Sequence, residues 1–97
     1  MMNFKISDVT ISQKNDPLII AEIGINHNGS LERAIKIADQ AIKSGAKVIK
    51  HQTHIVEDEY SYHAKNIKPG NSNKNIYKII KDCSLNEEDE FKLMQYI

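Results

Sequence analysis

The hydrophobic positions of this chain change period along its length. Apolar and polar side chains alternate over residues 4–6 and 9–11, which predicts a short two-stranded hairpin with one buried face. Residues 18–21, directly after Pro17, are instead a continuous apolar run, which is typical of a parallel strand buried on both faces. The pattern therefore predicts a small hairpin followed by the first strand of a different sheet.

A helical stripe follows this strand. Ser30 is a good N-cap for the helix, and Gly45 is placed as the residue that ends it. A second apolar run, residues 46–50, begins at once, so residues 18–53 are predicted to form a parallel strand-helix-strand unit. The apolar positions that define the helical stripe are Leu31, Ala34, Ile35, Ala38, Ala41 and Ile42.

The second half of the chain is predicted to be mostly helical. It begins with a long polar connection, about residues 54–70, and connections of that length are usually functional or disordered. Residues 76–80 then indicate a short helix. Asn86 caps a further helix, whose acidic first turn, Glu87–Glu90, complements the positive end of the helix dipole. The inner stripe of that helix is predicted to be Phe91, Met94 and Ile97.

The predicted sheet calls for more strands than these. Two parallel strands of the kind found in the centre of a sheet have edges and faces that further strands and helices normally cover. In addition, the last helix has no residue that signals its end. At 97 residues the chain holds one domain at most. We therefore expect the first part of a larger α/β enzyme, and we expect the chain alone neither to fold stably nor to catalyse.

Composition excludes several classes of partner. The 13 basic and 13 acidic side chains cancel, so there is no electrostatic footprint for nucleic acid or for an anionic membrane. The N-terminus has no apolar segment of signal-peptide length, and no later run approaches a membrane span, which predicts a cytoplasmic protein. The single cysteine, Cys83, is expected to be a packed thiol.

Both predicted parallel strands turn from apolar to polar near their carboxyl ends. Because side chains alternate across a strand, Glu22 shares a face with the apolar residues before it, and Lys50 shares a face with Gln52. A buried ion pair between Glu22 and Lys50 would be the structural interpretation. Burying two charges is expensive, however, so charged residues at strand ends are also candidates for a functional site. Both interpretations stay open on these grounds.

The remaining polar motifs are less specific. The histidines His27, His51, His54 and His63 could form a metal cluster with Glu22, but their spacing favours structural or supporting roles. Gly24 and Gly29 indicate a backbone with special dihedral angles ahead of a helix N-terminus, where an anion site and an ordinary turn are both possible. The acidic run Glu57–Glu59 is by default solvated, unless a functional loop holds it against basic groups.

Three segments resemble the N-terminal part of bacterial N-acetylneuraminate (sialic acid) synthases. They are Pro17–Gly29, Gly45–Glu59 and Pro69–Asn71, and the similarity extends through Asn86–Glu90. The resemblance covers nearly the whole chain from Pro17 onward, and the motifs are long and in the right order.

The resemblance implies a fold and a domain organisation. The fold is α/β, the N-terminal part of a (β/α)8 TIM barrel preceded by a short β-hairpin and truncated after about two β/α units. Residues 1–16 would be the hairpin and linker, and residues 17–97 the first part of the barrel. In this family an antifreeze-like domain follows the barrel and reaches the partner's active site in a homodimer.

The resemblance also implies an activity and a set of site residues. The reaction is condensation of phosphoenolpyruvate with N-acetylmannosamine to give N-acetylneuraminate and phosphate, with a divalent metal, typically Mn2+. Glu22 matches the family's metal-ligand glutamate, Lys50 its phosphoenolpyruvate-binding lysine, and Gln52 and Asn71 its amino-sugar contacts. The family's two metal-ligand histidines lie on later strands and match no histidine here.

Two alternatives to this activity remain. The chain could belong to a synthase for a related nonulosonic acid, such as legionaminic or pseudaminic acid, or to another phosphoenolpyruvate-condensing enzyme. From a different class, it could be an interaction module or an inactive remnant. Turnover on different amino sugars would distinguish a sialic acid synthase from a synthase for a related nonulosonic acid. Cooperative unfolding of the isolated chain would support an interaction module.

Overall fold

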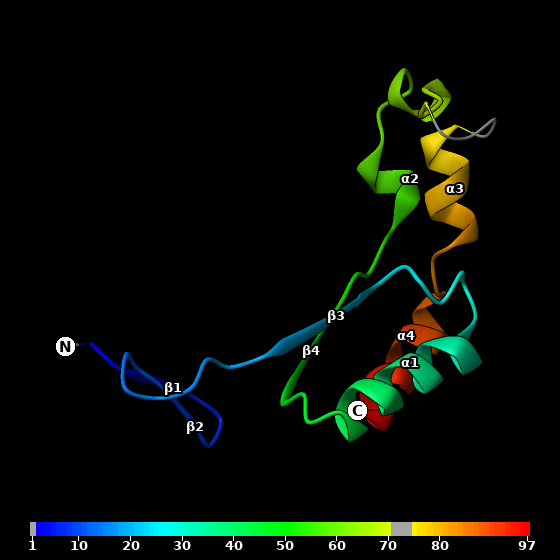
Figure 1. The fold of residues 1–97 in the computed structure, drawn as a ribbon. Helices are drawn as coiled ribbons and strands as arrows, with labels where there is room; N and C mark the ends of the chain where they lie inside the picture. The colour runs from blue at the N-terminus through cyan, green and yellow to red at the C-terminus, as the bar shows by residue number, and fades with distance from the viewer. Residues whose placement is uncertain (1, 71–74) are drawn as a thin grey trace.

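A computed structural model describes residues 2–70 and 75–97 of the chain (Figure 1). It has a mixed α/β architecture, and no helix in the described ranges is long and apolar enough to cross a membrane. In chain order the elements are β1 (Phe4–Ile6), β2 (Val9–Ile11), β3 (Ile20–Gly24), α1 (Leu31–Lys43), β4 (Val48–His51), α2 (Val56–Glu59), the 3-10 helix η1 (Ala64–Asn66), α3 (Ile76–Asp82) and α4 (Glu87–Tyr96).

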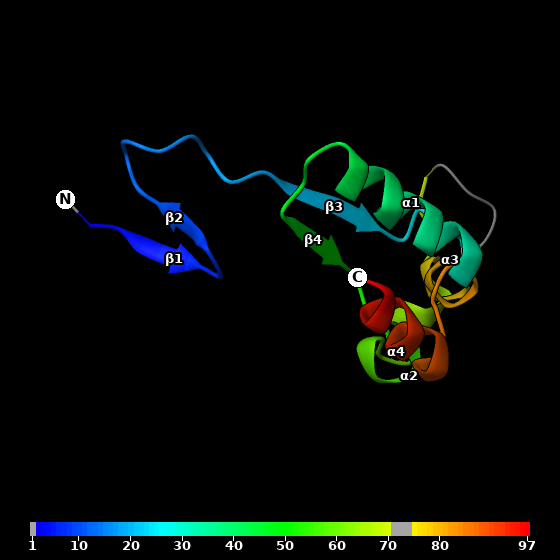
Figure 2. The same cartoon turned by 90° about the horizontal axis from the view of Figure 1, so that it is seen from below.

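The predicted hairpin is confirmed, but its predicted buried face is not. Strands β1 and β2 pair antiparallel, with Phe4 opposite Ile11 and the turn residue Ser7 at a φ of 55°. Every residue of β1 is exposed, and Phe4 keeps 59% of its surface in solvent. Figures 1 and 2 show the hairpin standing away from the helices, so no described element lies beneath it to cover its apolar side.

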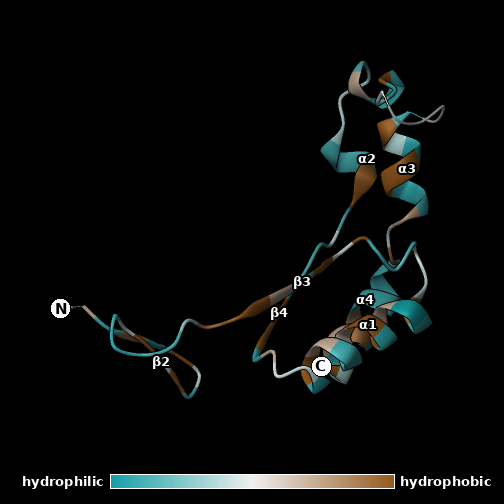
Figure 3. Cartoon of the chain, in the orientation of Figure 1, coloured by the Kyte–Doolittle hydropathy of each residue, from teal (hydrophilic) through white to brown (hydrophobic). Residues whose placement is uncertain are grey.

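The strand-helix-strand unit is confirmed with a shifted first strand. Strands β3 and β4 pair parallel, and α1 runs between them with the Ser30 hydroxyl accepting a hydrogen bond from the backbone N–H of Arg33. Strand β3 begins at Ile20 rather than Leu18, because its partner offers nothing before Val48 to pair with. Ile20 is 51% exposed, so the prediction of burial on both faces is wrong for the start of this strand. The hydropathy colouring of Figure 3 shows this exposed hydrophobic stretch leading into β3.

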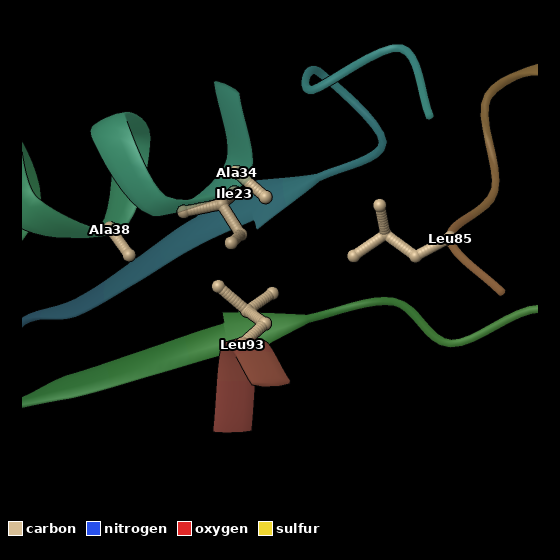
Figure 4. Close-up of a cluster of buried hydrophobic side chains, with 5 residues drawn as sticks. All are labelled: Ile23, Ala34, Ala38, Leu85 and Leu93. Atoms are coloured by element: carbon tan, nitrogen blue, oxygen red, sulfur yellow. The ribbon is translucent and has the colours of Figure 1, made fainter. Parts of the chain in front are cut away.

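The core lies between α1, the end of β3 and α4. Five side chains form it, and Figure 4 shows them converging from four segments of the chain. They are Ile23, Ala34, Ala38, Leu85 and Leu93. The two alanines of α1 have no exposed surface, so the helix approaches the sheet closely.

The predicted inner stripe of α4 is wrong. Phe91, Met94 and Ile97 are 55%, 64% and 52% exposed, whereas Leu93 is 2% exposed and belongs to the core. The inner face passes through Glu90 and Leu93, which lie one turn apart on the helix. A hydrophobic stripe could not reveal this face, because one of its members is charged.

The predicted polar connection over residues 54–70 is not featureless, because it contains α2 and η1. Together with α3 these helices form an arm that projects from the sheet (Figure 1). The Glu57 carboxylate of α2 contacts both other helices of the arm. It accepts a hydrogen bond from the Tyr77 hydroxyl of α3, and it lies 3.4 Å from Lys65 Nζ of η1 and 3.6 Å from Lys81 Nζ of α3. Glu57 is therefore held against basic groups rather than left as part of a solvated run.

The chain as a whole is extended. Its Cα radius of gyration is 16.9 Å, against roughly 13 Å for a compact domain of about 100 residues. The projecting hairpin and arm account for the difference (Figure 1). A small core and a large exposed apolar surface are consistent with marginal stability of the chain alone, which stays a prediction.

Candidate active site at the carboxyl ends of two parallel strands

The parallel register brings the two predicted charged residues together. Glu22 pairs directly with Lys50 across β3 and β4, and Lys50 Nζ lies 3.5 Å from Glu22 Oε1. The Lys50 and Glu22 side chains keep 62% and 53% of their surface in solvent. An ion pair this exposed contributes at most about 1 kcal/mol to stability. The interpretation as a buried structural pair is therefore wrong, and both side chains are accessible to a ligand.

A bulge at the end of β3 shapes the neighbouring surface. The register advances two residues on β3, from Glu22 to Gly24, for one residue on β4, which turns Ile23 into the core. Gly24 then adopts a φ of 54°, a left-handed conformation that glycine tolerates best. A Cβ at Gly24 would stand 3.7 Å from Nε2 of Gln52, so the Gln52 amide lies over this glycine. The predicted binding residue Gln52 thus joins Glu22 and Lys50 at the same strand ends.

Gln52 is in turn held by its neighbours in sequence. His54 Nε2 lies 3.2 Å from Gln52 Oε1, and His54 Nδ1 lies 2.9 Å and 3.1 Å from the two carboxylate oxygens of Glu59. The sequence pattern favoured a structural or supporting role for His54 and left Glu59 in an acidic run that is solvated by default, and the contact between the two was not predicted. The short spacing of His54 from Gln52 was the available signal, but it gained meaning only because α2 carries Glu59 back to the end of β4.

His27 is a structural residue in the turn between β3 and α1. Its side chain is 1% exposed, and its Nδ1 accepts a hydrogen bond of 3.0 Å from the backbone N–H of Gly29. Gly29 has a φ of 79°, and a Cβ there would lie 2.6 Å from the carbonyl oxygen of Asp82. The special glycine dihedrals are therefore confirmed, and at Gly29 they serve close approach of the backbone to the end of α3.

His51 faces away from the strand-end site and toward α4. Its Nε2 lies 2.7 Å from Glu90 Oε2, which also accepts a hydrogen bond of 3.1 Å from the Thr53 hydroxyl. The rings of His51 and His27 are 5.5 Å apart. Burial is the largest cause that lowers the pKa of His27, the neighbouring His51 lowers it further, and Glu90 opposes them. These histidines bind the strand end to the helix layer.

The described residues do not form a complete metal centre. Within residues 2–70 and 75–97, no three histidine, cysteine, aspartate or glutamate side chains converge in a way that could hold a metal ion. Glu22 supplies one hard oxygen donor of the kind that Mn2+ accepts. The fourth predicted site residue, Asn71, lies outside the described residues.

The fold and the strand ends define the class of protein: a mixed α/β chain with exposed polar side chains at the carboxyl ends of neighbouring parallel strands. Residues 35–97 match the NeuB family. The chain belongs to the NeuB family.

Individual relatives agree with this assignment. The chain is 31% identical to the protein MJ1065 of Methanocaldococcus jannaschii over 96 residues, which cover 99% of the chain and 26% of that protein. It is 36% identical to the N,N'-diacetyllegionaminic acid synthase of Legionella pneumophila over 83 residues, which cover 79% of the chain and 23% of that enzyme.

A solved structure supports the fold. The crystal structure of the spore coat polysaccharide biosynthesis protein SpsE from Bacillus subtilis matches with a TM-score of 0.62 and 26% identity, over 98% of this chain and 24% of SpsE. The chain thus spans about a quarter of the length of the relatives that it matches.

Proposed function

We propose that this chain forms one wall of the active site of a nonulosonic acid synthase, within the first part of a (β/α)8 barrel. The observation that carries the proposal is the accessible Glu22–Lys50 pair at the carboxyl ends of β3 and β4, with the Gln52 amide beside it. In (β/α)8 enzymes the active site lies at the carboxyl ends of the strands. Membership of the NeuB family supports the same class of activity.

The reaction that we propose is condensation of phosphoenolpyruvate with an N-acetylated amino sugar, giving a nonulosonic acid and phosphate. Lys50 carries the positive charge that an anionic substrate needs, and its exposed ammonium can exchange Glu22 for a carboxylate or phosphate. Gln52, and Asn71 by resemblance, offer neutral hydrogen bonds suited to the hydroxyl and amide groups of a sugar.

Glu22 is proposed as a single ligand to a divalent metal, typically Mn2+, whose other ligands would come from beyond these 97 residues. When bound, such an ion acts as a Lewis acid that polarises a substrate carbonyl. The residues of this chain contribute one oxygen donor and a neighbouring ammonium, which neutralises the carboxylate when no metal is there.

Two acceptor sugars are consistent with these residues. N-acetylmannosamine, the acceptor for N-acetylneuraminate, is favoured by the resemblance over His51–Glu59. The amino-sugar precursor of legionaminic acid is favoured by the name of the Legionella relative. The proposal covers both, and turnover decides between them.

The test is a chimera in which this chain replaces the segment that it matches in the Legionella synthase. Phosphate release from phosphoenolpyruvate is measured with manganese and each acceptor sugar in turn. We expect turnover with at least one sugar, and a loss of at least about 100-fold in Glu22→Gln and in Lys50→Met. A folded chimera without phosphate release would contradict the proposal.

A second charged pair provides the matched control. Glu32 and Lys36 form an exposed ion pair of 3.3 Å on the outer surface of α1, one turn apart. Glu32→Gln and Lys36→Met make the same chemical changes as the site variants, away from the strand ends. Both control variants are expected to keep turnover within about twofold, because exposed pairs contribute little.

A further inference from the structure

The His54 side chain occupies an unusual position between two hydrogen-bonding partners. It lies three residues after the end of β4, is 18% exposed, and bridges the Glu59 carboxylate on α2 and the Gln52 carboxamide. Glu59 is itself fixed, because its Oε1 also accepts a hydrogen bond of 3.2 Å from the backbone N–H of Ile55. The imidazole is therefore held in one orientation from the Glu59 side.

The chemistry of the partners determines which ring nitrogens carry protons. An ionised carboxylate can only accept, so Nδ1 of His54 must donate to Glu59. Nε2 lies 3.2 Å from Oε1 of Gln52, a carbonyl oxygen that also can only accept. The Gln52 carboxamide is thereby held with its oxygen on the His54 side.

The contact with His54 decides which end of the Gln52 carboxamide faces a ligand. With its oxygen at the imidazole, Gln52 directs its NH2 group over Gly24, toward the strand ends that carry Glu22 and Lys50. Without that contact the carboxamide could turn over, and Gln52 would then present an acceptor where it now presents donors.

We propose that His54, held by Glu59, is a positioning residue that fixes Gln52 as a hydrogen-bond donor and so determines specificity for an acceptor sugar with an oxygen at that place. This inference rests on the proposed function for the identity of the ligand.

The kinetic test uses the chimera and compares three variants. His54→Phe removes both hydrogen bonds, and Glu59→Gln keeps an acceptor for Nδ1 while removing the charge of the carboxylate that holds the ring. Asp58→Asn removes the same charge one residue away in α2 and serves as the matched control. We expect the KM for N-acetylmannosamine, or for the sugar that the chimera prefers, to rise roughly tenfold in the first two variants, as for loss of one charged hydrogen bond.

The same variants are expected to leave kcat, and the KM for phosphoenolpyruvate, within about twofold of the unsubstituted chimera. An equal fall of kcat for every variant, or a KM for the sugar that does not change in His54→Phe, would overturn the inference.

A spectroscopic measurement separates this inference from the proposed function. In a chimera with 15N labelling confined to residues 1–97, the side-chain NH2 signals of Gln52 are identified by their absence in Gln52→Leu. We expect these signals to shift in His54→Phe and in Glu59→Gln, and to stay unchanged in Asp58→Asn. If the chimera has no turnover but these signals behave as described, the proposed function fails while the His54–Gln52 coupling stands. Gln52 signals that do not follow His54 refute the coupling even in an active chimera.

Discussion

Replacement of Gly29 by alanine tests how closely the turn before α1 approaches the end of α3. The new Cβ would lie 2.6 Å from the carbonyl oxygen of Asp82 and 3.4 Å from that of Ser84. Both neighbours are backbone atoms, so neither can move aside as a flexible side chain would. The turn or the end of α3 must therefore shift, and the core residue Leu85, three positions after Asp82, must move with it.

The expected loss of stability has two parts, a dihedral cost and an overpacking cost, and a second glycine allows them to be measured separately. A left-handed φ costs an alanine about 1–2 kcal/mol, and overpacking adds about 1–3 kcal/mol, so Gly29→Ala should lower the free energy of unfolding by about 2–5 kcal/mol. Gly45 also has a positive φ, 98°, but a Cβ there meets nothing within 4 Å. Gly45→Ala therefore carries only the dihedral cost.

The assay is thermal unfolding of the chimera carrying each variant, followed by circular dichroism. A difference of about 1–3 kcal/mol corresponds to a Tm lower by roughly 2–12 °C for Gly29→Ala than for Gly45→Ala. Equal Tm values for the two variants would refute the reasoning, because the contact with Asp82 would then contribute nothing beyond the dihedral cost.

Three further predictions concern stability of the chimera. Leu93→Ala should lower the free energy of unfolding by about 2–5 kcal/mol, whereas Met94→Ala, at a 64% exposed position, should change it by less than about 0.5 kcal/mol; equal urea midpoints would contradict the core assignment. Ser30→Ala should cost about 1 kcal/mol by the same assay, since it removes the cap on Arg33, and Ser30→Asp should restore most of it. Because the pKa of His27 lies below its ordinary value of 6.5, the unfolded chain gains a proton first as the pH falls, so stability should decrease from about pH 6.5 downward; His27→Gln should flatten that decrease in urea midpoints measured across this range.

Local signals predicted the elements whose ends are set by local chemistry. The predicted caps Ser30 and Asn86 both accept hydrogen bonds from the first turns of their helices, and α1 and α4 begin immediately after them. The parallel pairing of β3 with β4 followed from two apolar runs separated by one helix. The residues that face each other at the strand ends, Glu22 and Lys50, were likewise accessible from alternation alone.

The features that sequence reasoning missed depend on contacts between distant segments. The inner face of α4 includes Glu90 because His51, 39 residues earlier, supplies its partner. Helix α2 is four residues long, too short for propensity to decide, and Glu57 in it is held by Tyr77 of α3. Hydropathy periodicity carries no information on either contact.

Because side chains alternate at the end of β4, the number of residues there determines which side chains share a face and how far apart they are. Consecutive strand residues advance about 3.3 Å, so the side chains of Lys50 and Gln52 leave the backbone roughly 6.6 Å apart on one face while His51 points to the other. Deletion of a single residue within β4 would therefore exchange the two sets, turning the His51 imidazole toward the strand-end surface and the Lys50 and Gln52 side chains toward the helix layer. Changes in chain length here should therefore be poorly tolerated, and natural relatives should agree in how many residues separate these positions.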